Sequence, residues 1–456
     1  MSKKNFVILG LFAVLLTLSI NQNAIAGADW QEKQKELFAK LGVKPGDVID
    51  KSNWEKAKDI VPEPVVNWVK NGEWIIKVGE MQYDLDFTPE WYALSAKNKG
   101  KYGLGSKKEI IDLSTGKFPK YIAGMPFPDV DIKNDPDGAM KRMHNTVVSR
   151  CINGSYDDVA EPEGGNLQWV GKGGYERGIR VSMRKYYYWN RPNGEQPNPN
   201  DYLYTTSTLA HWPYDISGTA QLYFRYLDGR DDDVYAYVPA IRRVKRLSGA
   251  NRSDPFMGAD STFDDQDGWD GQNESMTWSY IGETVMLMPK FEGDTKTAKE
   301  MKKNQQGAWQ YYIKDGLKYG WEDKTWSGVP YAYVNAVWVP REMWIIKAVP
   351  KDPYYAYGIM EFYVDKLSGI PVFDKKYNKA GEYWKFVIYQ PCMVDIPDPK
   401  YAATAHAFNV AGPLLAVDEK THHAMCMPLD DITQIADSPR VNPRDFTPQN
   451  LRVLTK

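Results

Sequence analysis

The sequence predicts a mainly β protein of the α+β class, with strands arranged as an antiparallel meander. Of its 456 residues, 30 are Tyr, 16 are Trp and 15 are Phe, residue types that favour strands. A further 36 Gly and 29 Pro supply turns. Strand-like runs are joined by short turns such as Asp228-Gly229 and Ser368-Gly369, as antiparallel neighbours require.

The first 26 residues have the three parts of a secretory signal peptide. Lys3 and Lys4 precede an apolar run from Phe6 to Leu16, and Ala24-Ile25-Ala26 matches the small-residue cleavage pattern. We therefore expect residues 1–26 to be removed and residues 27–456 to form a single large domain in the periplasm. The alternative is an uncleaved anchor helix. Because the apolar run is short for a membrane span, we expect the mature chain to be soluble or peripheral to the outer membrane.

Helical spacing is confined to a few segments. Trp30, Leu37 and Leu41 recur at helical spacing, and a second helix is expected to begin at Ser52 and to end before Pro62, which gives an N-terminal helical segment over about 28–60. A further helix is expected from Asp294 to Tyr312. Residues from about 391 to 456 are expected to form an irregular extension. The predicted strands include Trp74–Val78, Ile179–Trp189, Thr205–Pro213, Ala220–Leu227, Val234–Leu247, Ser275–Met288, Tyr331–Val339, Arg341–Val349, Ile359–Asp365 and Gly381–Tyr389.

The overall charge is balanced, with 57 Lys and Arg against 59 Asp and Glu, so no nucleic-acid partner is expected. The exception is a basic cluster on the predicted strand Val234–Leu247. Strand alternation places Arg243 and Lys245 on one face, and Arg242 and Arg246 on the other. Aspartates follow downstream and predict ion pairs that hold a loop against the strand end; they are Asp260, Asp264, Asp265, Asp267 and Asp270.

The same acidic loop also allows a weaker calcium interpretation. Asp265, Asp267, Gly268 and Glu274 fall at the third, fifth, sixth and twelfth positions of an EF-hand loop. However, Phe263 occupies the first ligand position, which argues against a calcium site.

Three cysteines, Cys151, Cys392 and Cys426, leave one thiol over in an oxidising compartment. We expect Cys392 and Cys426 to form a disulfide, because both lie in the irregular C-terminal region. Alternatively, His422, His423 and Cys426 could bind a metal if they share one face of a helix.

Motifs for catalysis are scarce. The Gly-x-Ser-x-Gly elbow, the dinucleotide fingerprint, the Walker loop and His-Glu-x-x-His are all absent from the sequence. We therefore expect no enzyme, no catalytic residue and no cofactor, although a pair of carboxylates in an aromatic cleft would suit a glycoside hydrolase.

Several segments resemble one bacterial family, the domain of unknown function family 1329. They are Gly124–Pro128, the Tyr237–Arg246 run with its Arg-Arg-Val-Lys-Arg block, Gly258–Asp265 and Asp445–Leu451. The family is similar to outer-membrane lipoprotein-sorting proteins of the LolA and LolB type. This resemblance implies a large curved antiparallel sheet, an incomplete β-barrel, with helices covering its concave apolar face. It also implies a partnership with an inner-membrane exporter of the resistance-nodulation-division type and an outer-membrane protein.

The resulting hypothesis is a periplasmic carrier or adaptor for a lipid or another hydrophobic molecule. The expected cavity wall is Ala220–Leu247 with Tyr331–Val349, and Asp260, Asp264 and Asp265 are expected to form a gate or an ion-pair loop. The expected ligand-binding residues are Arg242, Arg243, Arg246, Tyr235, Tyr237, Trp278, Tyr280, Trp338 and Trp344. Two alternatives are a glycan-binding or glycan-processing protein and a purely structural adaptor.

Overall fold

The computed structural model describes most of the chain. The predicted signal peptide, residues 1–26, and Cys151 lie outside the described residues. The described ranges are 30–150, 155–160, 166–248, 252–291, 299–313, 316–404, 407–408, 412–428, 432–436, 438 and 440–454. Among these residues, no helix is both long and apolar enough to cross a lipid bilayer.

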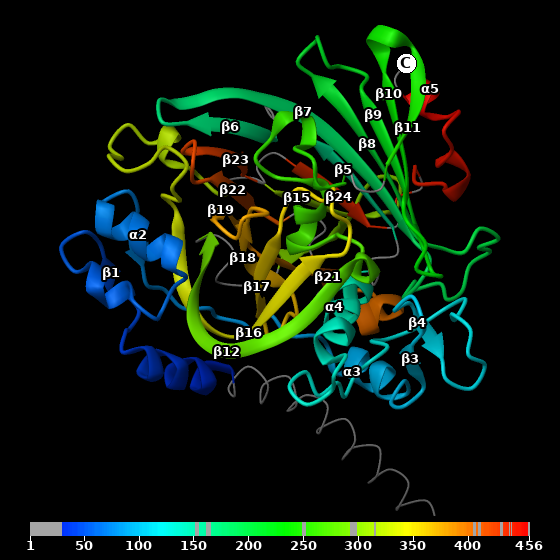
Figure 1. The fold of residues 1–456 in the computed structure, drawn as a ribbon, viewed down its shortest axis with the longest axis horizontal. Coiled ribbons are helices and arrows are strands. Elements are labelled where there is room, and N and C mark those ends of the chain that lie inside the picture. Colours follow the sequence, from blue (N-terminus) through cyan, green and yellow to red (C-terminus); the bar gives the residue numbers. More distant parts are fainter. Residues whose placement is uncertain are drawn as a thin grey trace, which may run out of the picture.

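A curved antiparallel sheet of thirteen strands dominates the molecule and confirms the predicted fold class (Figure 1). In the part of the chain that the structure describes, no ladder joins β11 to β12, so the sheet does not close into a barrel. From one edge to the other, the strands are β12 (Met276–Phe291), β16 (Ala336–Pro350), β17 (Ile359–Asp365), β18 (Pro371–Tyr377), β19 (Tyr383–Tyr389), β22 (Leu414–Asp418), β23 (His423–Met427), β6 (Leu167–Gly171), β7 (Gly174–Tyr187), β8 (Tyr202–Trp212), β9 (Ala220–Tyr226), β10 (Asp233–Val238) and β11 (Arg243–Leu247).

The sheet branches at the long strand β7. The first half of β7 pairs with β6, whereas Met183 to Tyr186 pair with β5 (Ser155–Ala160). From β5 the branch continues through β24 (Ile432–Ala436), β15 (Trp309–Ile313) and β14 (Lys302–Lys303). Small satellite ladders are β1 (Val48–Ile49) with β2 (Ile76–Lys77), β3 (Tyr102–Leu104) with β4 (Ile110–Asp112), and β13 (Lys299–Glu300) with β20 (Met393–Asp395) and β21 (Ala407–Phe408).

Helices cover the sheet at several places. A helix spans residues 30–41 as predicted. The longer helices are α2 (Glu63–Asn71), α3 (Pro89–Ala96) and α4 (Gly138–Ser149), and a single turn, α5 (Leu451–Leu454), lies near the end. Short 3-10 turns lie at Trp54–Ala57, Pro239–Ile241, Phe256–Gly258, Phe263–Gly268, Asn273–Ser275, Gly320–Glu322, Pro399–Thr404 and Pro443–Asp445.

Helix α2 corrects the predicted end of the N-terminal helical segment. The segment after Ser52 forms only a 3-10 turn, and α2 begins directly after Pro62 with Pro64 in its first turn. A proline is tolerated there because the first helical N–H groups have no intrahelical acceptor. Figure 1 shows α2 outside the curve of the sheet. Its Trp68 lies 5.1 Å from Trp74 and 5.7 Å from Phe386 of β19 between ring centroids.

Two other predicted elements were wrong. The helix expected from Asp294 to Tyr312 is replaced, in its described part, by β13, β14 and β15. Trp309 and Tyr311 instead pack against a small buried cluster that includes Met301 and Tyr401, and β15 pairs with β24. The strand expected from Val234 to Leu247 is a hairpin, because the chain turns at Pro239–Ile241 and Arg242 takes a left-handed φ of 50°.

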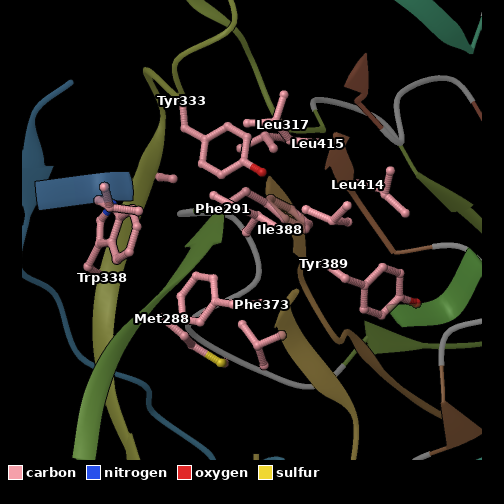
Figure 2. Packing of buried hydrophobic residues seen from close by; sticks show 14 of the residues in the cluster. Met288, Phe291, Leu317, Tyr333, Trp338, Phe373, Ile388, Tyr389, Leu414 and Leu415 are labelled. Atoms are coloured by element: carbon pink, nitrogen blue, oxygen red, sulfur yellow. The ribbon is translucent and has the colours of Figure 1, made fainter. Parts of the chain in front are cut away.

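The largest buried cluster lies where several strands of the sheet meet the N-terminal segments. Figure 2 shows part of it, with Met288 and Phe291 from β12, Trp338 from β16, Phe373 from β18 and Ile388 from β19. Alternation along β19 sends Phe386 and Ile388 toward Trp68 of α2 and leaves Lys385, Val387 and Tyr389 for the concave side.

Candidate ligand-binding site

The concave side of the sheet is occupied by one loop of the same chain, residues 252–275, here called the inner loop. It connects β11 to β12, and Figure 1 shows it (green) inside the curve of the sheet. Its backbone is held by strands far away in the sequence. Trp169 of β6 donates its Nε1–H to the Gly258 carbonyl at 2.8 Å, and Lys385 of β19 donates to the Asp260 carbonyl at 2.9 Å.

The centre of the inner loop is anchored by Trp269, whose side chain is completely buried. Its ring centroid lies 5.4 Å from Trp278 and 5.2 Å from Phe362, and its Nε1–H donates to Asn273 Oδ1 at 2.8 Å. Just before it, Gly268 has a φ of +79°, and a Cβ there would lie 2.4 Å from the Pro371 carbonyl oxygen. Only glycine therefore permits the close approach of the loop to β18.

A buried network of charges joins the inner loop to β7 and β9. Arg252 Nε lies 2.7 Å from Asp264, Arg225 Nε lies 2.6 Å from Asp232, and Lys185 Nζ lies 3.2 Å from Asp270. Although burial raises the pKa of Asp270, the nearby charges of Lys185 and Arg150 lower it below the ordinary range. The network therefore keeps this carboxylate charged inside the protein.

A second buried group lies between the inner loop and β18. Lys376 forms an ion pair with Asp265 and lies 3.4 Å from Asp374. Burial raises the pKa of Asp374 to about 7, against the lowering effect of Lys376. One ammonium group thus serves two carboxyl groups.

These contacts correct the predicted pairing of the acidic loop with the basic cluster. Asp264 and Asp265 bind Arg252 and Lys376, and Asp260 lies 3.8 Å from Lys385. The cluster itself is exposed on the β10–β11 hairpin, where Arg246 pairs with Asp233. None of Arg242, Arg243 and Arg246 lines the pocket described below. The loop folds as an ion-paired segment, but its partners come from distant strands.

The predicted aromatic residues do not form one cavity. Tyr235 and Tyr237 pack in a cluster with Phe446 and Leu451 of the C-terminal segment. Trp278, Tyr280 and Trp344 belong to the cluster around α4, whereas Trp338 belongs to the largest cluster. Neither Ala220–Leu247 nor Tyr331–Val349 contributes a residue to the pocket described below, and their role as a cavity wall stays a prediction.

The metal and disulfide alternatives also fail in the described residues. No group of three or more potential metal ligands occurs in this part of the chain. Asp265 and Asp267 instead face Lys376 and Arg150. His423 and Cys426 lie on β23, a strand, so their side chains point to opposite faces. Cys392 and Cys426 are not joined by a disulfide, because Cys426 is buried within β23, paired with Leu415, and Cys392 follows β19 near Lys290.

The apolar pocket lies between the inner loop and the strands β6, β7, β8, β22 and β23. It has a volume of about 90 Å³ and is partly open. Thr208 and Asp267 are among its polar lining residues. Its apolar lining is Leu167, Val181, Met183, Phe256, Phe263, Leu414, Met425 and Met427. One sequence signal could have found this wall: Met425 and Met427 are two residues apart, which places both on one face of a strand.

A family model described as a protein of unknown function, DUF1329, matches residues 48–452, most of the chain. The chain belongs to the DUF1329 family. No curated protein matches this DUF1329 chain significantly.

Solved structures similar to this DUF1329 protein share little sequence with it. A DUF1329 family protein from Desulfovibrio piger is 14% identical, with a TM-score of 0.43 over 70% of this chain and 100% of that one. A candidate outer-membrane lipoprotein-sorting protein domain from Vibrio parahaemolyticus is also 14% identical, with a TM-score of 0.42 and the same coverage. A LolA superfamily protein from Nitrosomonas europaea is 11% identical, with a TM-score of 0.32 over 66% of this chain and 96% of that one.

Proposed function

We propose that this protein is a periplasmic carrier that holds an apolar ligand, or the apolar part of a lipid, in the pocket beneath the inner loop. The observation that carries the proposal is the pocket wall, in which methionine, leucine, valine and phenylalanine side chains from the sheet face those of the loop. Each methylene group moved from water into such a site contributes about 0.8 kcal/mol. Methionine side chains suit this task because they adapt to ligands of different shape.

The structure supports binding of the apolar ligand by residues of the sheet and the inner loop more than by the exposed basic cluster. A headgroup role for Arg242 and Arg243 remains a separate part of the proposal, since both side chains are exposed and have room for an anionic group. We further propose that the carrier receives its ligand from an inner-membrane exporter of the resistance-nodulation-division type and delivers it toward an outer-membrane protein. The resemblance of the sequence to its family supports this partnership.

The test is native mass spectrometry with solvent extraction, on mature protein purified from the periplasm without detergent. We expect an apolar species bound at close to one per chain. Met427→Lys should abolish this binding, because it places a charge at the pocket wall. Met286→Lys is the matched control, since Met286 is also a half-buried strand methionine but does not line the pocket. Protein that stays empty after incubation with membrane lipids would refute the carrier proposal.

One observation favours the second candidate, glycan binding. A separate cavity of about 360 Å³ is lined mainly by polar groups, together with the rings of Trp309 and Tyr401. Aromatic rings beside hydrogen-bonding groups are a common arrangement at sites that take amphipathic ligands. Calorimetric titration with soluble oligosaccharides tests this candidate. Binding that is lost in Trp309→Ala would favour it, whereas no heat of binding would leave the carrier as the sole proposal.

A further inference from the structure

The apolar pocket has a polar end formed by two residues from different elements. Thr208 lies on the concave face of β8, opposite Met183 of β7, and Asp267 comes from the inner loop. Both residues line the pocket, and their side chains are almost completely buried. Thr208 Oγ1 and Asp267 Oδ1 have no hydrogen-bond partner among the described residues. Because leaving such groups unsatisfied costs about 1–3 kcal/mol each, a ligand that pairs with them gains affinity.

The position of Asp267 Oδ1 is fixed by the rest of its residue. Asp267 Oδ2 lies 3.5 Å from Arg150 Nη1, so one side of the carboxyl group faces a cation. The backbone is left-handed at Asp267, with a φ of 55°, and Gly268 follows in close contact with Pro371. The ion pair with Arg150 and the close approach of Gly268 to Pro371 together fix the position of Asp267 Oδ1 in the pocket.

The charges around this end select against ionised ligands. A ligand carboxylate next to the ionised Asp267 meets a like charge. A ligand ammonium is repelled by the positive charges of Arg150 and Lys185, which act on Asp267 from outside the pocket lining. Burial raises the pKa of Asp267 to about 7, against the lowering effects of these two cations. The carboxyl group is therefore present in both protonation states near neutral pH, and a hydroxyl group pairs with either one because it donates and accepts.

We propose that the pocket takes a neutral apolar alcohol and binds its hydroxyl group to Thr208 and Asp267. This inference rests on the proposed carrier function and narrows its ligand class. A pure hydrocarbon would leave the two oxygens unsatisfied, and a fatty acid or an amine would bring a charge to a site that already contains both signs.

The test compares four small probes by calorimetric titration of the full mature protein: 1-hexanol, 1-methoxypentane, hexanoate and hexylammonium. All four have similar length, and the ether accepts a hydrogen bond but donates none. We expect 1-hexanol to bind about five- to tenfold more tightly than the ether, the affinity ratio of one additional hydrogen bond. The two ions should bind more weakly than the alcohol.

Thr208→Val removes the Thr208 hydroxyl group while keeping the shape of the pocket nearly unchanged. It should weaken 1-hexanol binding about fivefold, because one hydrogen bond is lost at nearly constant side-chain shape. The ether oxygen can also accept a hydrogen bond from the Thr208 hydroxyl, so ether binding should weaken by a similar factor. The melting temperature should not fall, because Oγ1 has no partner among the described residues to lose. Thr206→Val is the matched control: Thr206 is buried on the same face of β8 and its Oγ1 also has no partner in the described chain, but it does not line the pocket.

The outcomes distinguish a failure of the alcohol proposal from a failure of the proposed carrier function. If no probe binds and no apolar species copurifies, the carrier function itself fails. If the alcohol and the ether bind equally, or if Thr208→Val and Thr206→Val behave alike, the alcohol inference is overturned while the carrier function stands.

Discussion

Lys376 is a buried cation shared by two carboxyl groups, Asp265 from the inner loop and Asp374 from its own strand. Lys376→Met should destabilise the protein by about 3–5 kcal/mol, because it leaves both carboxyl groups buried without a counter-charge. Lys375→Met is the matched control. The neighbouring Lys375 pairs with the exposed Glu63 and lies near the rings of Tyr377 and Tyr383, so its loss leaves no buried carboxyl group unpaired and should cost about 1 kcal/mol or less. Urea unfolding measures both variants. Equal losses would contradict this account of Lys376.

The same group makes stability depend on pH. In the folded protein the pKa of Asp374 is about 7, above its ordinary value of 3.8. Between these two pH values the folded state holds a proton that the unfolded chain has released, so the free energy of unfolding falls as pH rises from about 4 to about 7. Asp374→Asn should flatten this slope and raise stability at pH 8 relative to the wild type.

Urea unfolding at pH 4.5 and at pH 8 checks the pH prediction. Asp129→Asn is the control, because Asp129 is exposed and its replacement should leave the slope unchanged. Burial also raises the pKa of Asp267 and Glu419 to about 7, so part of the slope remains in Asp374→Asn. A slope identical to that of the wild type would show that Asp374 ionises normally.

Residue patterns predicted the kind of interaction in the acidic loop but not its partners. The sequence places Asp264 and Asp265 near the basic cluster, which suggested ion pairs between neighbours. In the folded protein Asp265 instead meets Lys376, a residue 111 positions away. Strand pairing brings β18 under the loop, and no local pattern contains that information.

At the scale of elements, the inner loop approaches β18 more closely than any side chain permits. Gly268→Ala should lower stability in two ways: a Cβ at a φ of +79° costs about 1–2 kcal/mol, and its overlap with the Pro371 carbonyl adds about 1–3 kcal/mol. Gly307→Ala isolates the first effect, because Gly307 has a φ of +78° and no atom within 4 Å of the added Cβ. Thermal unfolding compares them. Equal decreases in melting temperature would mean that the inner loop moves away from Pro371 without a loss of stability.

Elements with a regular strand pattern were predictable, and elements fixed by tertiary contacts were not. The strands around Ile359–Asp365 and Ala220–Tyr226 agree closely with their predicted ranges. The segment from Asp294 to Tyr312 carries helix-like spacing, but β24 offers β15 a ladder and Trp309 a buried contact. Pairing with β24 therefore outweighs the weak local preference of this segment for a helix.

At the scale of the whole molecule, β7 belongs to both branches of the sheet. β6 and β5 pair with successive halves of β7. If either branch unfolds, the half of β7 that it pairs with loses its backbone hydrogen bonds, and this destabilises the strand that the other branch also needs. We expect one unfolding transition in urea, with coincident curves from tryptophan fluorescence and far-ultraviolet circular dichroism. Two separate transitions would show that the branches are independent units.

The architecture was predictable from the sequence and the pocket was not. Aromatic content, turn spacing and the family resemblance together indicated a curved, incompletely closed sheet, which the structure confirms. The pocket draws its wall from β6, β7, β8, β22, β23 and the inner loop, segments that span residues 166 to 427. The predicted binding residues were chosen as aromatic or basic, whereas this wall is mostly aliphatic and sulfur-containing.

The inner loop joins the two strands that form the free edges of the sheet, β11 and β12. The loop is therefore continuous in sequence with both edges of the sheet. For the proposed carrier, we therefore expect ligand binding under the inner loop to change the distance between β11 and β12. A spectroscopic distance between labels on β11 and β12, measured with and without 1-hexanol, checks this expectation.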